Sequence, residues 1–244
     1  VDVGPPSSLS KLISADQVEK AAVQQYRQLQ QGAAQKNALA PDTHPQVIRL
    51  RAIAQRLIPF TYEWNERARS WKWEVNLIGS KQINAFCMPG GKIAFFTGIL
   101  DQLKLTDDEV AMVMGHEMAH ALREHARARL AKSAGTGAAL SIGAQLLGWG
   151  QVGDLAARAG TQLITLKFSR SDETEADLVG LELAARAGYD PKASVSLWQK
   201  MATASRNQGG LSFLSTHPSG PDRISKLEAN LPKVEKLYRD ARKS

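Results

Sequence analysis

The amino-acid sequence predicts a mainly helical α+β fold, with a small antiparallel sheet laid against the helices. Two observations support this prediction. Apolar and polar side chains alternate over residues 73–77, which is typical of a strand, and residues 83–88 and 92–97 resemble two more strands. After Gly98, apolar residues recur at helical spacing over most of the remaining chain.

The N-terminal part predicts two helices. Residues 9–31 carry apolar side chains at helical spacing, and residues 32–45 read as a linker. Residues 46–68 repeat the helical pattern, which is disturbed near Pro59 because proline lacks the backbone donor a helix needs. We therefore expect residues 1–44 to be a helix and linker packed on one structural unit, residues 45–244.

The strand region contains one clear turn. Pro89-Gly90-Gly91 separates the second and third predicted strands, and this composition is typical of a tight reversal. The first predicted strand is Trp73 to Leu77, in which Glu74 and Asn76 are the polar members. The turn predicts that residues 83–88 and 92–97 form a hairpin.

Composition excludes few classes of protein. The chain has 244 residues, 43% hydrophobic residues and a net charge of +7, values compatible with a soluble globular protein. We find no nucleic-acid motif and no interleaving of basic and aromatic residues, so the charge is best interpreted as a solvated basic surface. The single cysteine, Cys87, cannot form an internal disulfide.

Two segments bear on membrane association. Residues 1–8 have neither a charged start nor an apolar run, so we expect a mature or truncated chain. Residues 134–153 carry no charged residue but are rich in Gly, Ser, Thr and Gln, which predicts a Gly-rich helical hairpin rather than a membrane span. A peripheral contact with a membrane is compatible with the apolar residues of this segment.

The main functional motif is His116-Glu117-Met118-Ala119-His120. It lies in a predicted helix that begins with the capping box Thr106-Asp107-Asp108-Glu109. Residues four apart share a helix face, so both imidazoles can bind one metal ion. Glu117 can then act on a water molecule at the metal, and zinc suits such ligands.

His125 does not extend this motif. It is nine residues after His116, which on a continuous helix corresponds to the opposite side, so we expect a surface or packing residue. A metzincin site would require glycine at position 123 and histidine at 126, where the chain has Arg123 and Ala126. The third metal ligand must therefore come from elsewhere.

Glu173 and Asp177 are the candidates. They are four residues apart in a predicted helix that runs to Gly188, so they share a face. One carboxylate can bind the metal while the other accepts a proton from a ligand histidine; alternatively, both form a solvated acidic patch at a helix N-terminus. Glu175 points about 200° away around the helix, so we expect it to be dispensable for metal and activity.

Four segments together resemble metallopeptidase family 48, whose members include HtpX-, Oma- and CAAX-prenyl-protease-like zinc proteases of the gluzincin type. The segments are Asn84-Ala85-Phe86 with Pro89-Gly90-Gly91, His116 to His120, Ser169-Arg170 with Glu173 to Asp177, and Thr216-His217-Pro218 with Arg223. The resemblance spans roughly residues 45–230. It implies a zincin-like metalloprotease domain, and this chain shows neither the helical repeats nor the membrane helices of some relatives.

The resemblance also implies roles for individual residues. His116, His120 and Glu173 would bind one Zn²⁺ per chain, Glu117 would be the general base, and Asp177 would support His116. His217 and Arg223 are candidates for stabilising the oxyanion, and His217 can alternatively cap the metal as a fourth ligand. Substrate would extend along the strand at Asn84, Ala85 and Phe86.

These expectations define a zinc endopeptidase that hydrolyses unfolded or misfolded proteins, that is, an enzyme of protein quality control. One alternative is an inactive or latent relative that binds clients as a chaperone or scaffold; a basic binder of nucleic acid or anionic lipid is another. The implied partner is a polypeptide substrate, and the implied location is the bacterial periplasm. A peripheral or lipid-anchored association with the membrane is compatible with this location.

Overall fold

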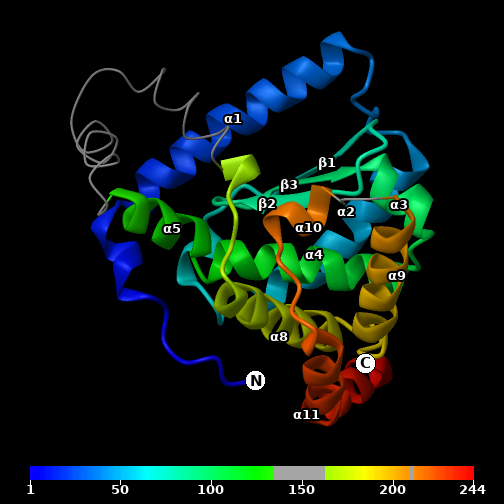
Figure 1. Ribbon diagram of the computed structural model, residues 1–244. Coiled ribbons are helices and arrows are strands. Elements are labelled where there is room, and N and C mark those ends of the chain that lie inside the picture. Colours follow the sequence, from blue (N-terminus) through cyan, green and yellow to red (C-terminus); the bar gives the residue numbers. More distant parts are fainter. Residues whose placement is uncertain (135–162, 209–211) are drawn as a thin grey trace.

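The computed structural model describes residues 1–134, 163–208 and 212–244 (Figure 1). The α-helices are α1 (Ala15–Gln35), α2 (Pro45–Leu57), α3 (Thr97–Leu103), α4 (Asp107–Leu122), α5 (His125–Ala134), α8 (Arg170–Arg186), α9 (Ala193–Gln208), α10 (Ser212–Thr216) and α11 (Arg223–Lys243). The 3₁₀ helices are η1 (Ser8–Leu12), η2 (Ile58–Phe60) and η3 (Glu66–Arg69). The strands are β1 (Glu74–Ile78), β2 (Ala85–Met88) and β3 (Lys92–Phe96). The predicted fold class, mainly helical α+β, is confirmed.

The sheet is mixed, which corrects the prediction of an antiparallel sheet. The strand order is β1-β3-β2; β2 and β3 pair antiparallel as the predicted hairpin, whereas β1 and β3 pair parallel. Gly90 and Gly91 both have positive φ, which only glycine adopts readily, and they make the hairpin turn. Alternation along a strand reveals which residues share a face but not the direction of a neighbouring strand, so the sequence could not reveal the parallel pairing.

The second helix is shorter than predicted. It begins after His44, whose ring accepts a hydrogen bond from the Gln46 backbone amide, and ends at Leu57. Pro59 follows directly and cannot donate a helical hydrogen bond, so the chain continues as η2 and, further on, η3. The pattern over residues 46–68 therefore combines one α-helix with two 3₁₀ turns.

Helix α1 covers one face of the sheet, and α4 covers the other (Figure 1). On the α1 side, Val18, Ala22 and Tyr26 pack with Ala94 and Phe96 in one apolar cluster. The Tyr26 hydroxyl donates to the backbone carbonyl of Ile93 at 2.5 Å and so ties α1 to the central strand. The sheet is thus buried on both sides, and β2 forms one of its two edges.

Helices α4 and α8 cross closely below the sheet (Figure 1). The crossing is at Gly115 and Gly180, where neither residue has a side chain to separate the backbones. A Cβ atom built on Gly180 would lie 2.6 Å from the backbone nitrogen of His116, and one on Gly115 would lie 2.9 Å from the Gly180 carbonyl oxygen. The sequence therefore permits a helix contact that places residues 116 onward directly against α8.

The membrane-related predictions are only partly addressed by the structure. The predicted hairpin at residues 134–153 lies, except for its first residue, outside the described residues. Within the described parts of the chain, every helix is too short or too polar to cross a lipid bilayer.

We expect Gly180→Ala to destabilise the protein by about 1–3 kcal/mol, the usual cost of overpacking a tight contact. The added methyl group would meet backbone atoms of α4, which cannot rotate away as a side chain can. Gly32→Ala is the matched control: it lies within α1 with no atom near the new Cβ, so it should stabilise by about 0.5–1 kcal/mol. Urea unfolding measures both, and equal effects would contradict the importance of the crossing.

Candidate active site

Helix α4 presents His116, Glu117 and His120 inside the protein. The helix begins with the predicted capping box, in which Thr106 and Glu109 each accept a hydrogen bond from the other's backbone amide. All three motif side chains are buried, each at most 3% exposed. The Nε2 atoms of His116 and His120 lie 3.2 Å apart. The two imidazoles therefore converge on one point, as the four-residue spacing predicts.

Helix α8 adds Glu173 to this point. A second capping box, between Ser169 and Asp172, begins the helix and fixes the position of its first turn. Oε2 of Glu173 lies 2.7 Å from Nε2 of His120, and Oε1 lies 3.4 Å from Nε2 of His116. The carboxylate thus faces both imidazole nitrogens of α4.

His217 is the fourth member of the cluster. It follows α10, and its backbone amide donates to the carbonyl of Phe213. Its Nδ1 lies 3.0 Å from both carboxylate oxygens of Glu173. Ligand atoms from His116, His120, Glu173 and His217 all lie within 4.8 Å of one another, and the four side chains are buried. Among the described residues, this is a site of three histidines and one glutamate able to hold a metal ion.

The donor set fits zinc. Zinc binds imidazole nitrogen and carboxylate oxygen, usually four ligands in tetrahedral geometry. Burial lowers the pKa of His120 well below its usual range, against the opposing effect of Glu173, so the ring stays in the neutral form that binds metals. Oε1 of Glu117 is 3.1 Å from Nε2 of His217, yet it forms no hydrogen bond with the described residues. This buried oxygen therefore faces a position where a further polar group is needed.

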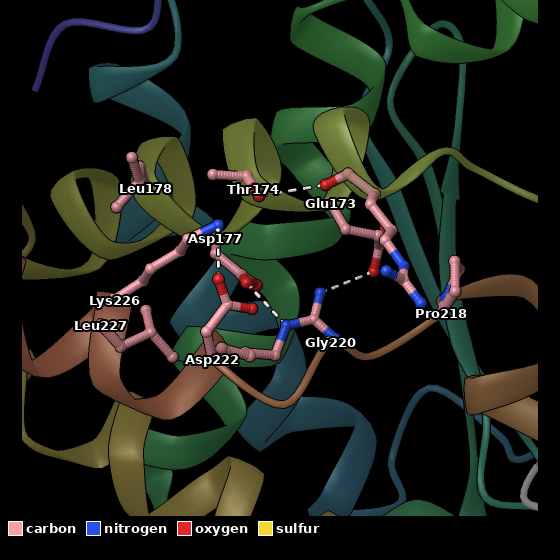
Figure 2. Close-up of a pocket in the computed structure, with 11 residues that line it drawn as sticks. Glu173, Thr174, Asp177, Leu178, Pro218, Gly220, Asp222, Lys226 and Leu227 are labelled. Carbon is pink, nitrogen blue, oxygen red and sulfur yellow. Dashed lines mark hydrogen bonds and ion pairs between the residues drawn. The ribbon is translucent and has the colours of Figure 1, made fainter.

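Asp177 and Arg223 support the cluster from behind. Asp177 Oδ1 lies 2.9 Å from Nδ1 of His116, and Arg223 donates from Nε to Asp177 and from Nη2 to Glu173. Figure 2 shows Glu173 and Asp177 on one side of α8, above the loop at Gly220. Burial lowers the pKa of His116, but Glu173 and Asp177 outweigh it and raise the value to about 10. A metal ion must therefore displace a proton from this ring.

Two aromatic rings hold imidazoles of the cluster in place. Phe168 stacks on His120 with the ring centroids 3.8 Å apart, and Phe213 stacks on His217 at 4.1 Å. Neither residue was predicted from the sequence, because an isolated phenylalanine near a motif resembles an ordinary core residue. Only their positions close to Ser169 and His217 in the sequence could have suggested a role.

His125 lies next to His120. The prediction that it would lie on the opposite side of the helix from the motif is therefore wrong. Helix α4 ends at Leu122, Glu124 adopts a positive φ, and α5 begins at His125, so continuous helical spacing does not apply. The chain reversal buries the His125 ring, with its Nδ1 2.9 Å from Nδ1 of His120. Nε2 of the same ring lies 2.8 Å from Glu175, so Glu175 is linked to the cluster although it is not part of it.

The strand β2 runs along the open side of the cluster. A narrow cavity of about 30 Å³ is lined by Asn84 to Pro89, by Glu117, His120 and His217, and by apolar side chains including Leu166. Asn84 and Ala85 are buried, and Phe86 is half-buried. The strand proposed to bind substrate and the cluster therefore share one cavity.

A comparison of the sequence with known protein families identifies one family whose matched residues include this cluster. The model of peptidase family M48 matches residues 48–231, which include every member of the cluster. The chain belongs to peptidase family M48. Its site of three histidines and one glutamate is that of a metalloendopeptidase of this family.

Curated relatives support this assignment. The chain is 35% identical over 199 residues to the mitochondrial metalloendopeptidase OMA1 of Schizosaccharomyces pombe, a match covering 81% of this chain and 56% of the relative. It is 38% identical over 171 residues to OMA1 of Arabidopsis thaliana, covering 69% of this chain and 34% of the relative. Metalloprotease LoiP of Escherichia coli is 30% identical over 154 residues, 61% of this chain and 58% of the relative. These matches span only about a third to three-fifths of each relative.

We expect Glu173→Ala to weaken metal binding by more than about 100-fold, beyond the range of about 10–100-fold for residues that only support ligands. Thr174→Ala is the matched control, because that side chain is bonded only to a backbone carbonyl of its own helix. Titration with zinc against a competing chelator compares the two. Equal affinity in the two variants would remove Glu173 from the ligand set.

Proposed function

We propose that this protein is a zinc-dependent endopeptidase that hydrolyses peptide bonds in unfolded or misfolded polypeptides. The observation that carries this proposal is the convergence of His116, His120, Glu173 and His217 beside the buried carboxylate of Glu117. The first three residues would hold the ion. When bound, zinc would polarise the scissile carbonyl group and make an attacking water more acidic.

Glu117 is the proposed general base. Its carboxylate is buried and one residue from the first ligand, and its Oε1 lies 3.1 Å from Nε2 of His217. It would accept the proton of the water that adds to the carbonyl carbon, then deliver that proton to the amine as the C–N bond breaks. This transfer needs no other titratable side chain.

His217 and Arg223 are both candidates for stabilising the oxyanion. Nε and Nη2 of Arg223 are held by Asp177 and Glu173, whereas its buried Nη1 has no hydrogen-bond partner among the described residues. His217 faces Glu117 through Nε2 and Glu173 through Nδ1, within the cluster. We infer that His217 caps the metal at rest and that substrate displaces it.

The edge strand β2 supports the proposed choice of substrate. Among the described residues its one partner in the sheet is β3, so we propose that an extended peptide pairs along its other edge, beside Asn84, Ala85 and Phe86. Strand addition requires an extended substrate segment, which compact domains do not offer. This geometry favours unfolded polypeptide and is the basis for proposing a role in quality control.

A periplasmic location in bacteria is part of the proposal, with peripheral or lipid-anchored membrane association. It draws support from bacterial relatives, namely LoiP and, in Yersinia pestis, a β-barrel assembly-enhancing protease that is 33% identical over 61% of this chain. The client-binding alternative would use the same strand edge without hydrolysis. The Glu117 variant below distinguishes the two functions.

We expect Glu117→Gln to abolish hydrolysis of an unfolded substrate such as casein while zinc remains bound. The amide keeps the shape of the side chain but cannot accept the proton, and the residue is not a ligand. Metal analysis of the purified variant beside a caseinolytic assay tests this. Turnover equal to that of the parent protein would refute the assigned base, and a parent without hydrolysis would favour the client-binding function.

We expect His217→Ala to keep zinc and to raise kcat/KM for short peptides, because substrate no longer has to displace the ring. A fall in kcat of about 10²–10³, the usual cost of losing one oxyanion donor, would instead show that His217 acts mainly by stabilising the oxyanion. His44→Ala is the control, since His44 caps α2 away from the cluster. Kinetics unchanged in both variants would remove His217 from the mechanism.

A further inference from the structure

A chain of contacts leads from the ligand His120 to the surface side of α8. Nδ1 of His120 lies 2.9 Å from Nδ1 of His125, and Nε2 of His125 lies 2.8 Å from Oε2 of Glu175. His120 and His125 are buried, and the side chain of Glu175 is 25% exposed. Neither His125 nor Glu175 belongs to the four-residue metal cluster.

The chemistry of these contacts sets the direction of each hydrogen bond. An ionised carboxylate can only accept, so Glu175 requires a proton on Nε2 of His125. The other nitrogen of a neutral His125 ring then has a lone pair and accepts from Nδ1–H of His120. With its proton on Nδ1, His120 must present the lone pair of Nε2, the atom that faces Glu173 and the metal position.

The carboxylate of Glu175, at the end of this series of contacts, is itself held in place. Arg123 donates from Nε to Glu175 at 3.1 Å and from Nη2 to the Gly4 carbonyl. The other charged group near His125 is Asp172, 3.9 Å from Nε2 and paired with Arg129. Arg123 and His125 thus both contact Oε2 of Glu175, which is the acceptor at this end of the series of contacts.

The arrangement repeats what surrounds the first ligand. His116 contacts Asp177 directly, and Arg223 holds that carboxylate. For His120 the carboxylate is Glu175, held by Arg123, with the imidazole of His125 inserted between them. Each ligand histidine thus has an arginine-bound carboxylate from α8 on its far nitrogen, one directly and one through a second ring.

We propose that His125 and Glu175 are positioning residues that fix the tautomer and orientation of His120 and thereby set the metal affinity of the site. The inference rests on the proposed binding of zinc, and it reverses the expectation from sequence that Glu175 is dispensable. Supporting residues of this kind typically change metal affinity by about 10–100-fold.

Paired substitutions separate hydrogen bonding from packing. His125→Ala removes the acceptor for His120, whereas His125→Asn places an amide oxygen close to the position of Nδ1. Glu175→Ala removes the acceptor for His125, whereas Glu175→Gln retains an oxygen there. Glu124→Gln is the matched control, because Glu124 precedes His125 but is paired with Arg127.

Zinc affinity of each full-length variant is measured by chelator competition, together with the visible spectrum of the Co²⁺-loaded protein. We expect about 10–100-fold weaker zinc binding and an altered Co²⁺ spectrum in both alanine variants. Most of the affinity should return in His125→Asn and Glu175→Gln, and Glu124→Gln should match the parent. Should His125→Ala not fold, the Glu175 pair tests the same chain of contacts.

Two results would overturn the inference. Parent-like affinity in Glu175→Ala would show that the carboxylate does not act on His120. Equal losses in each alanine variant and its amide partner would show that the charge of Glu175 or the ring of His125 matters rather than hydrogen bonding to His120. A parent protein that fails to bind zinc would instead refute the proposed function, so the two failures are distinguishable.

Discussion

The close crossing of α4 and α8 is the contact on which the site depends. Each helix contributes ligands that would be too far apart if side chains separated the backbones at Gly115 and Gly180. Two glycines in helix interiors cost roughly 1–2 kcal/mol of helix propensity together. That cost is offset where both helices begin at capping boxes and bury their apolar residues in one core. The two glycines therefore lower the intrinsic stability of each helix, but they allow the close contact that brings the ligands of α4 and α8 together.

Charge explains why the two helices carry the residues they do. Glu173 lies in the first turn of α8, where the helix dipole favours negative charge, and Glu175 and Asp177 follow it along the same helix. Burying carboxylates is costly unless each has a partner, and Arg223 and Arg123 supply these partners from α11 and the end of α4. The imidazoles then lie between carboxylates on one side and the metal position on the other.

Sequence could predict the parts of the site that depend on regular helices. The capping box at Thr106 to Glu109 could be predicted from its residues, and the four-residue spacing of His116 and His120 and the shared face of Glu173 and Asp177 follow from helix geometry. His125 was misplaced because α4 ends without a glycine or proline: Leu122, Arg123 and Glu124 contain no stop signal, yet Glu124 adopts a left-handed conformation. The parallel pairing of β1 and the stacking of Phe168 on His120 depend on tertiary contacts, which local patterns do not encode.

The parallel pairing also explains why a strand edge is available beside the metal cluster. Had β1 paired with β2, the edge next to Glu117 would be covered by β1. Because β1 pairs with β3 on its far side, β2 has one edge without a strand partner among the described residues, while its residues still pack on α4. The short strands could not stay ordered alone; α1 and α4 bury both faces and hold that edge in place. The order of the strands thus places the edge that is proposed to bind a peptide beside the helices that carry the metal ligands.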